Sequence, residues 1–162
     1  MLEPILIVSD AHIPYHDKRA FAMMLKVAKD LKPKHVYIIG DFLDCYTVSS
    51  HSKNPNRALR LDREIDAGKR SLDLLDALGA KHRTYIGGNH EDRLQRYLQD
   101  KAPELFNVVD IPSLLDLHDR GWNYVPYKRD TQLGKIHLTH DVGCAGRNSI
   151  FRCLDTYQHS IV

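Results

Sequence analysis

Side chains that can bind metals or move protons follow several short apolar runs of this sequence. The residues concerned are Asp10, His12, Asp41, Asp44, Asn89, His90 and His140. Carboxylates, imidazoles and an amide oxygen, with no thiolate among them, suit hard or borderline divalent ions such as manganese, iron, zinc or magnesium. A carboxylate has two oxygens and can bridge two such metal ions. Two metal ions held side by side in this way support in-line displacement at phosphorus.

The apolar runs read as parallel strands separated by amphipathic helices, which predicts one α/β domain. We expect a buried parallel strand at Ile5–Ser9 and further strands at His35–Ile39, His82–Ile86 and Lys135–Thr139, with the start of another at Ser160–Val162. We expect helices over Lys18–Leu31, Leu61–Leu78, Glu91–Leu98 and Phe151–Tyr157. Ligands of open α/β sheets bind at the carboxyl ends of the strands, so the polar residues should meet at that edge.

Length and composition favour one globular domain. The chain has 162 residues, of which 43% are hydrophobic and 27% charged. The apolar runs are too short to cross a bilayer and no signal peptide is evident, so we expect no membrane partner. Three cysteines without a CxxC motif suit a reducing compartment, which predicts a cytoplasmic protein.

Four short blocks in order resemble the calcineurin-like metallophosphoesterases, and most closely their small phage and bacterial members. The blocks are Asp10-x-His12, Gly40-Asp41-x-x-Asp44, Gly88-Asn89-His90-Glu91 and the downstream His140. The resemblance implies an α/β fold with a central two-layer β-sandwich flanked by helices. It also implies a binuclear metal centre that hydrolyses phosphate esters with a metal-activated hydroxide. Manganese is the first choice of metal, and iron, zinc, nickel and magnesium are the alternatives.

The resemblance also implies a role for each metal-binding position. Asp10 and His12 correspond to ligands of the first metal, and Asp41 to the carboxylate that bridges both metals. Asn89 and His140 correspond to ligands of the second metal.

His90 corresponds to the family's catalytic histidine, and Asp44 to the carboxylate that orients it. A carboxylate beside an imidazole fixes its tautomer and raises its pKa, which suits a proton donor. Glu91 and Asp92 are expected to be structural, in the first turn of a helix where negative charge is favoured.

One block of the family is missing. The Gly-His-x-His segment, which gives one histidine to each metal, does not occur, and the chain ends at Val162 where a strand leading into it would begin. We therefore expect residues 1–162 to be a single metallophosphoesterase domain that is incomplete at its C-terminal end. Such a domain would bind metals weakly.

The substrate is less well defined. Basic residues outnumber acidic ones between His51 and Arg70, and His51, Arg57 and Arg60 are candidate phosphate-binding residues; a solvated helix face is the alternative. The first functional hypothesis is a phosphodiesterase acting on nucleotides or nucleic acid. The second is a phosphomonoesterase or phosphoprotein phosphatase. The third is a non-catalytic domain with an incomplete metal site.

Overall fold

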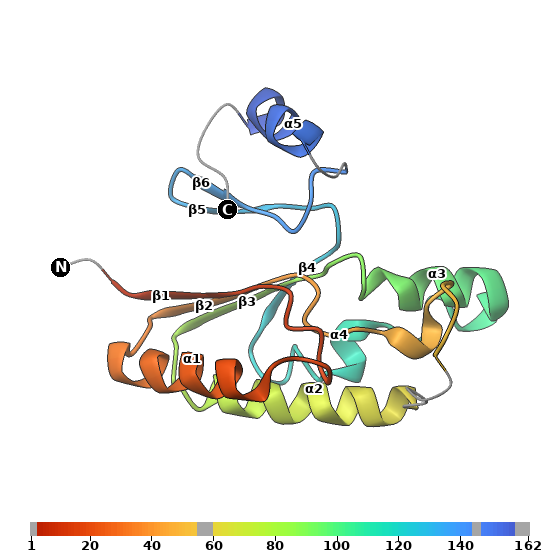
Figure 1. Cartoon of the computed structure of the whole chain (residues 1–162), viewed down its shortest axis with the longest axis horizontal. Helices are drawn as coiled ribbons and strands as arrows, with labels where there is room; N and C mark the ends of the chain where they lie inside the picture. Colours follow the sequence, from red (N-terminus) through yellow and green to blue (C-terminus); the bar gives the residue numbers. More distant parts are fainter. Residues whose placement is uncertain (1–2, 55–59, 144–146, 158–162) are drawn as a thin grey trace.

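A computed structural model of the chain describes residues 3–54, 60–143 and 147–157. Its centre is a parallel sheet with the strand order β1-β2-β3-β4 (Figure 1). The strands are β1 (Ile5–Val8), β2 (His35–Ile39), β3 (His82–Ile86) and β4 (Asn123–Val125). Their carboxyl ends therefore lie along one edge of the sheet, as expected for a ligand-binding edge.

Helices cover one face of this sheet. The long helices α1 (Lys18–Leu31) and α2 (Leu61–Asp76) run along that face (Figure 1). The fully buried side chains Phe42, Leu72, Leu75 and Tyr85 belong to the core that α2 shares with the sheet. The shorter α3 (Asp92–Lys101) and α4 (Ile111–Leu114), with the 3₁₀ turns η1 (Tyr46–Val48) and η3 (Pro103–Leu105), complete this layer.

A second, smaller sheet lies over the opposite face (Figure 1). It pairs β5 (Thr131–Leu133) with β6 (Ile136–Leu138) in antiparallel fashion, and α5 (Arg147–Tyr157) follows. Leu138 packs in a separate small core with Tyr37, Ile39 and Ile86 of the large sheet. The predicted α/β fold is thus confirmed: a parallel sheet is flanked by helices and carries a second β layer.

The first strand differs from the expectation of a fully buried strand. Ile5 is 40% exposed and Ile7 is 37% exposed. The small core under β5 and β6 involves β2 and β3, which leaves the outward side chains of the edge strand β1 partly open to solvent. An apolar run therefore identified the strand, but it overestimated how much of the strand is covered.

Several short elements were missed from sequence. The strands β4 and β5 have three residues each and α4 has four, too few for an apolar period to show. The predicted strand at Ser160–Val162 lies outside the described residues. None of the described helices is both long enough and apolar enough to cross a membrane.

Candidate metal centre

The loops after β1 and β2 are joined by backbone hydrogen bonds. The amide of His12 donates to the carbonyl of Asp41 at 2.9 Å, and the amide of Ile13 donates to the carbonyl of Phe42 at 2.7 Å. Asp10, His12 and Asp41 all have φ angles of 50–51°, in the left-handed region that residues other than glycine rarely adopt. Strained backbone of this kind clusters at functional sites, where the surrounding structure holds it in place.

Glu91 holds the third loop against the second. Its buried carboxylate accepts hydrogen bonds from the amides of Asp41 (3.0 Å), Leu43 (2.8 Å) and Gly88 (2.8 Å) and from the Tyr85 hydroxyl (2.8 Å). The structural role expected for Glu91 is confirmed, but its cause is different. The carboxylate satisfies buried amide groups that would otherwise lack a partner, rather than only complementing a helix dipole.

Asp41 lies at the centre of the cluster. Possible ligand atoms of His12, Asp41 and His90 lie within 4.8 Å of one another, and so do those of Asp10, Asp41 and His140. Asp41 is 4% exposed and is the residue common to both groups. Two three-ligand groups that share one carboxylate are the arrangement that a bridging ligand requires.

The other possible ligands surround Asp41. His12 groups with His90 and Asp10 groups with His140. Nε2 of His12 also lies 3.9 Å from a carboxylate oxygen of Asp10, so the pairing of Asp10 with His12 on one metal stays a prediction. Asn89 lies beside the second group, because its Oδ1 is 3.0 Å from Nε2 of His140. All five predicted metal ligands therefore meet at the strand ends, and His90 lies among them.

Two glycines allow this close approach. A Cβ atom on Gly88 would lie 2.1 Å from Oδ1 of Asp41, and one on Gly40 would lie 2.2 Å from Nδ1 of His140. Any larger residue at either position would displace a side chain of the cluster. The oxygen and nitrogen donors, their spacing and these two glycines fit divalent metal ions.

The charges of the cluster are coupled. Burial alone would lower the pKa of His140, but Asp41, whose Oδ1 lies 3.3 Å from its Nε2, raises that pKa to about 9. Burial alone would raise the pKa of Asp41, but hydrogen bonds from His140 and from the His90 amide lower it below its ordinary value. The site thus stabilises an anionic Asp41 and favours positive charge beside it.

His90 is surrounded differently from the expectation. Its Nδ1 lies 2.9 Å from the backbone carbonyl of Asp44 and 3.9 Å from the Asp44 carboxylate, while Nε2 lies 2.7 Å from Nη2 of Arg93. Burial lowers the pKa of His90, and the Arg93 cation adds to this effect against the opposing charge of Asp41. The Asp44 carboxylate does raise the pKa of His90, as expected, but burial outweighs it and the net shift is downward.

Arg93 is the main residue that sequence reasoning missed. Its Nη1 donates to the Asp44 carbonyl at 2.8 Å and lies 3.4 Å from the Asp44 carboxylate. The available signal was position, because Arg93 follows His90 by three residues at the start of α3. Residues three apart on a helix lie on one face, so the first turn brings the guanidinium beside the imidazole.

Of the three candidate substrate residues, the structure describes His51 and Arg60, and neither belongs to the groups of possible metal ligands. His51 is exposed, and its amide donates to Oγ of Ser49 at 3.1 Å. The Arg60 side chain is 82% exposed and pairs with Asp62 at 3.1 Å, which is the geometry of a solvated helix end. Arg57 lies outside the described residues. A phosphate-binding role for these residues stays a prediction.

Comparison with known proteins agrees with this geometry. The sequence profile described as calcineurin-like phosphoesterase matches residues 3–156, nearly the whole chain. The chain belongs to the calcineurin-like phosphoesterase family. It is 27% identical over 132 residues to the Gene 54 protein of Mycobacterium phage D29, and 26% identical over 132 residues to that of Mycobacterium phage L5. Each match covers 78% of this chain and 52% of the relative, so the chain spans about half the length of these curated relatives.

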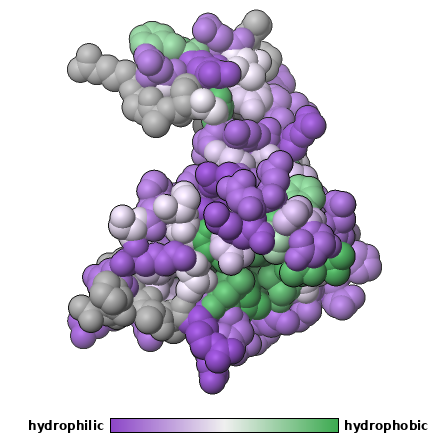
Figure 2. Space-filling model, turned by 90° about the vertical axis from the view of Figure 1, so that its right-hand side faces the viewer, coloured by the Kyte–Doolittle hydropathy of each residue, from purple (hydrophilic) through white to green (hydrophobic). Residues whose placement is uncertain are grey.

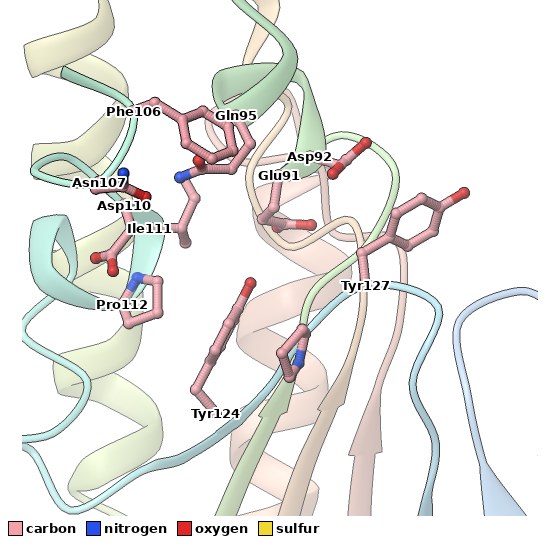
Figure 3. Close-up of a pocket in the computed structure, with 11 residues that line it drawn as sticks. Glu91, Asp92, Gln95, Phe106, Asn107, Asp110, Ile111, Pro112, Tyr124 and Tyr127 are labelled. Carbon is pink, nitrogen blue, oxygen red and sulfur yellow. The ribbon is translucent and has the colours of Figure 1, made fainter. Parts of the chain in front are cut away.

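The largest of the described pockets does not suit the phosphate group that a phosphoesterase must bind. A pocket of about 430 Å³ is lined by Glu91, Tyr124 and Tyr127 among other residues (Figure 3). It is lined by carboxylates, including Asp92 and Asp110, and by no lysine, arginine or histidine. The negative charge of this pocket disfavours a phosphate group.

A second buried glutamate of this phosphoesterase, Glu64 of α2, supports the loop after Asp44. The side chain is fully buried, and Oε1 accepts a hydrogen bond from the Cys45 amide while Oε2 has no hydrogen-bond partner among the described residues. Burial raises the pKa of Glu64 to about 7, against the lowering effect of that hydrogen bond. The folded protein therefore favours the protonated form of this side chain.

Glu64 predicts a specific pH dependence of stability. The pKa of Glu64 rises from 4.5 to about 7 on folding, so the folded state binds the proton more tightly than the unfolded state. The resulting contribution to the free energy of unfolding is complete below pH 4.5 and is lost as the pH rises through 7. One pKa unit corresponds to about 1.4 kcal/mol, so the loss is on the order of 3 kcal/mol. Urea unfolding of the metal-free wild type and Glu64→Gln between pH 4.5 and 8 should give a stability difference that follows this curve. A difference that stays constant over the whole range would contradict it.

Proposed function

We propose that this chain is a metal-dependent phosphodiesterase that acts on nucleotides or nucleic acid through a binuclear centre. The main support is the position of Asp41, a buried carboxylate that belongs to both groups of possible ligands at the strand ends. Membership of the calcineurin-like phosphoesterase family supports the reaction class, hydrolysis of a phosphoester with divalent metals. The diester preference, the two ions and the nucleotide substrate are the proposal.

Each side chain of the cluster has a role in this proposal. Asp41 would hold both ions, with Asp10 and His12 as ligands of one and His140 as a ligand of the other; the place of Asp41 in both groups of possible ligands supports this. Asn89 completes the His140 side, as its contact with that imidazole supports. Bound divalent ions, with manganese as first choice, would activate water and neutralise charge on the phosphoryl oxygens.

His90 and Arg93 face the reacting group in this proposal. The His90 imidazole lies between Arg93 on Nε2 and the Asp44 carbonyl on Nδ1. This arrangement fixes a neutral ring with its proton on Nδ1. An arriving phosphate would attract the Arg93 guanidinium, which binds phosphate oxygens well. Movement of Arg93 toward that phosphate would free Nε2. The negative charge of the phosphate would then favour a proton on Nε2, and His90 could donate that proton to the leaving oxygen.

Turnover of two generic esters tests the proposal. Bis(p-nitrophenyl) phosphate is a diester and p-nitrophenyl phosphate is a monoester with the same chromophore. With added manganese we expect the diester to be hydrolysed faster, and we expect EDTA to abolish the reaction. Faster turnover of the monoester would show a phosphomonoesterase instead. Hydrolysis of neither ester with any of the candidate metals would favour a non-catalytic domain.

A further inference from the structure

A basic pocket lies next to the metal centre, on the side of α3. Its volume is about 320 Å³, and it lies between α3 and the segment that follows η1. The charged or aromatic residues that line it are Lys53, Arg93, Arg96, Tyr97, Asp100 and Lys101. Of the four cations, Arg93 pairs with Asp44 and Arg96 with Asp92, so the positive charge of the pocket comes from Lys53 and Lys101, against the single lining carboxylate of Asp100. Its sign is opposite to that of the larger pocket beside Glu91.

One wall of this pocket is formed by a single face of α3. The five residues that α3 contributes to the pocket occupy positions i, i+3, i+4, i+7 and i+8, which form one continuous stripe of a helix. Leu94 and Leu98 lie on the other face of α3 and are buried in the core. The stripe from Arg93 to Lys101 extends for about 12 Å along the helix axis, at 1.5 Å per residue.

The pocket continues into the metal centre through its two arginines. Arg93 lies 2.7 Å from Nε2 of His90, and Nη2 of Arg96 donates to the backbone carbonyl of Asn89 at 3.0 Å. Both arginines therefore reach from the pocket wall to the loop that carries Asn89 and His90. A chain bound at the metal centre could enter this pocket without leaving the protein surface.

Two lysines of the pocket keep positive charge without an acidic partner in the described part of the chain, Lys101 at the end of the α3 stripe and Lys53 from the segment after η1. The ammonium group of Lys53 donates to the Thr47 carbonyl, and within the described ranges neither Lys53 nor Lys101 has a carboxylate partner. Tyr97 stands between the two ends and is 42% exposed, which leaves its ring accessible. The side of the molecule that carries α3 faces the viewer in Figure 2, and it shows many hydrophilic side chains beside a broad apolar area.

We propose that this pocket binds the nucleotide next to the bond that is cleaved, so that the substrate is a single-stranded oligonucleotide. Lys53 and Lys101 would contact the neighbouring phosphate, and a base would stack on Tyr97. Proteins that bind single strands combine a positively charged groove with exposed aromatic rings in this way. The inference rests on the proposed phosphodiesterase function and names its substrate class.

Binding of an uncleavable strand tests the pocket independently of turnover. The probe is a fluorescently labelled phosphorothioate tetrathymidylate, and its anisotropy is measured with the full chain and manganese at several salt concentrations. Tyr97→Ala should weaken binding roughly 5- to 150-fold, the range expected for the loss of one base stack. Lys101→Ala should reduce the slope of log K against log salt by about 0.7, as expected for the loss of one single-strand phosphate contact.

Two controls separate the pocket from general effects. Lys26→Ala removes an exposed lysine of α1 and should leave both affinity and salt slope unchanged. The Tyr97 and Lys101 variants should hydrolyse bis(p-nitrophenyl) phosphate at the wild-type rate, because that ester has no neighbouring nucleotide. Failure of the wild type to hydrolyse this ester would contradict the phosphodiesterase proposal, whereas the anisotropy measurements would still decide the pocket.

Three results would overturn the inference. One is a wild type that does not bind the tetrathymidylate more tightly than thymidine monophosphate. Another is equal loss of affinity in the Lys26 and Lys101 variants, which would show a diffuse charge effect. The third is unchanged affinity in Tyr97→Ala together with equal competition by inorganic tripolyphosphate, which would show a phosphate site without recognition of a nucleoside.

Discussion

Replacing Asp41 with asparagine is expected to lower ester hydrolysis by at least about 100-fold and to reduce the metal content of the protein. Loss of groups that only orient metal ligands already costs about 10- to 100-fold, and Asp41 is placed to be a ligand itself. An amide has one oxygen donor and no charge, so it is a poor bridge between two cations. The measurements are metal per protein by elemental analysis and turnover of bis(p-nitrophenyl) phosphate.

The fold should survive this change. The amide oxygen of asparagine can still accept the hydrogen bond that Asp41 Oδ1 receives from the His90 amide at 2.9 Å. Asp30→Asn, an exposed carboxylate on α1, is the matched control and should retain wild-type metal content and rate. Wild-type stoichiometry and rate in Asp41→Asn would rule out the bridging assignment.

Replacing His90 with alanine is expected to lower kcat by roughly 10²- to 10⁴-fold, the usual contribution of a general acid. The side chain is 16% exposed, and its Nε2 already lies against the guanidinium of Arg93, which itself extends from the basic pocket. Metal content should stay near that of the wild type, because Asn89 is the neighbour assigned to the metal. Elemental analysis and steady-state kinetics on the same preparation give both values.

A series of leaving groups separates the roles that His90 could have. An ester with a good leaving group needs no proton, so the loss in His90→Ala should shrink as the leaving group improves. An equal loss for all esters would exclude the general acid and leave an electrostatic role. A large fall in metal content would instead make His90 a ligand, as its grouping with His12 and Asp41 allows.

The sequence predicted the large parallel sheet well because its strands are apolar runs with clear ends. β2 and β3 have the predicted bounds, and the polar residues that follow them meet at one edge. The alternation of Ile136 and Leu138 also identified β6. β4 was missed, because Asn123–Val125 contains three residues and pairs only with β3. Neighbours in space, rather than local pattern, determine an element this short.

Residue type and strand-end position predicted which acids and histidines gather at this edge. The positive φ angles near 50° of Asp10, His12 and Asp41, which belong to the loops that carry them, were not predictable from residue type. Arg93 was missed because its effect on His90 depends on how the first turn of α3 follows the loop. The direction of the pKa shift of His90 depends on burial, which residue types alone do not give.

The most direct test of the account is a crystal of the chain grown with manganese and measured at the manganese absorption edge. The account predicts two anomalous peaks about 3.5–4 Å apart, the spacing typical of two-metal sites, with the Asp41 carboxylate between them. Asp10 and His12 should lie beside one peak, and Asn89 and His140 beside the other. A single peak, peaks away from Asp41, or no peak at saturating manganese would contradict the binuclear centre.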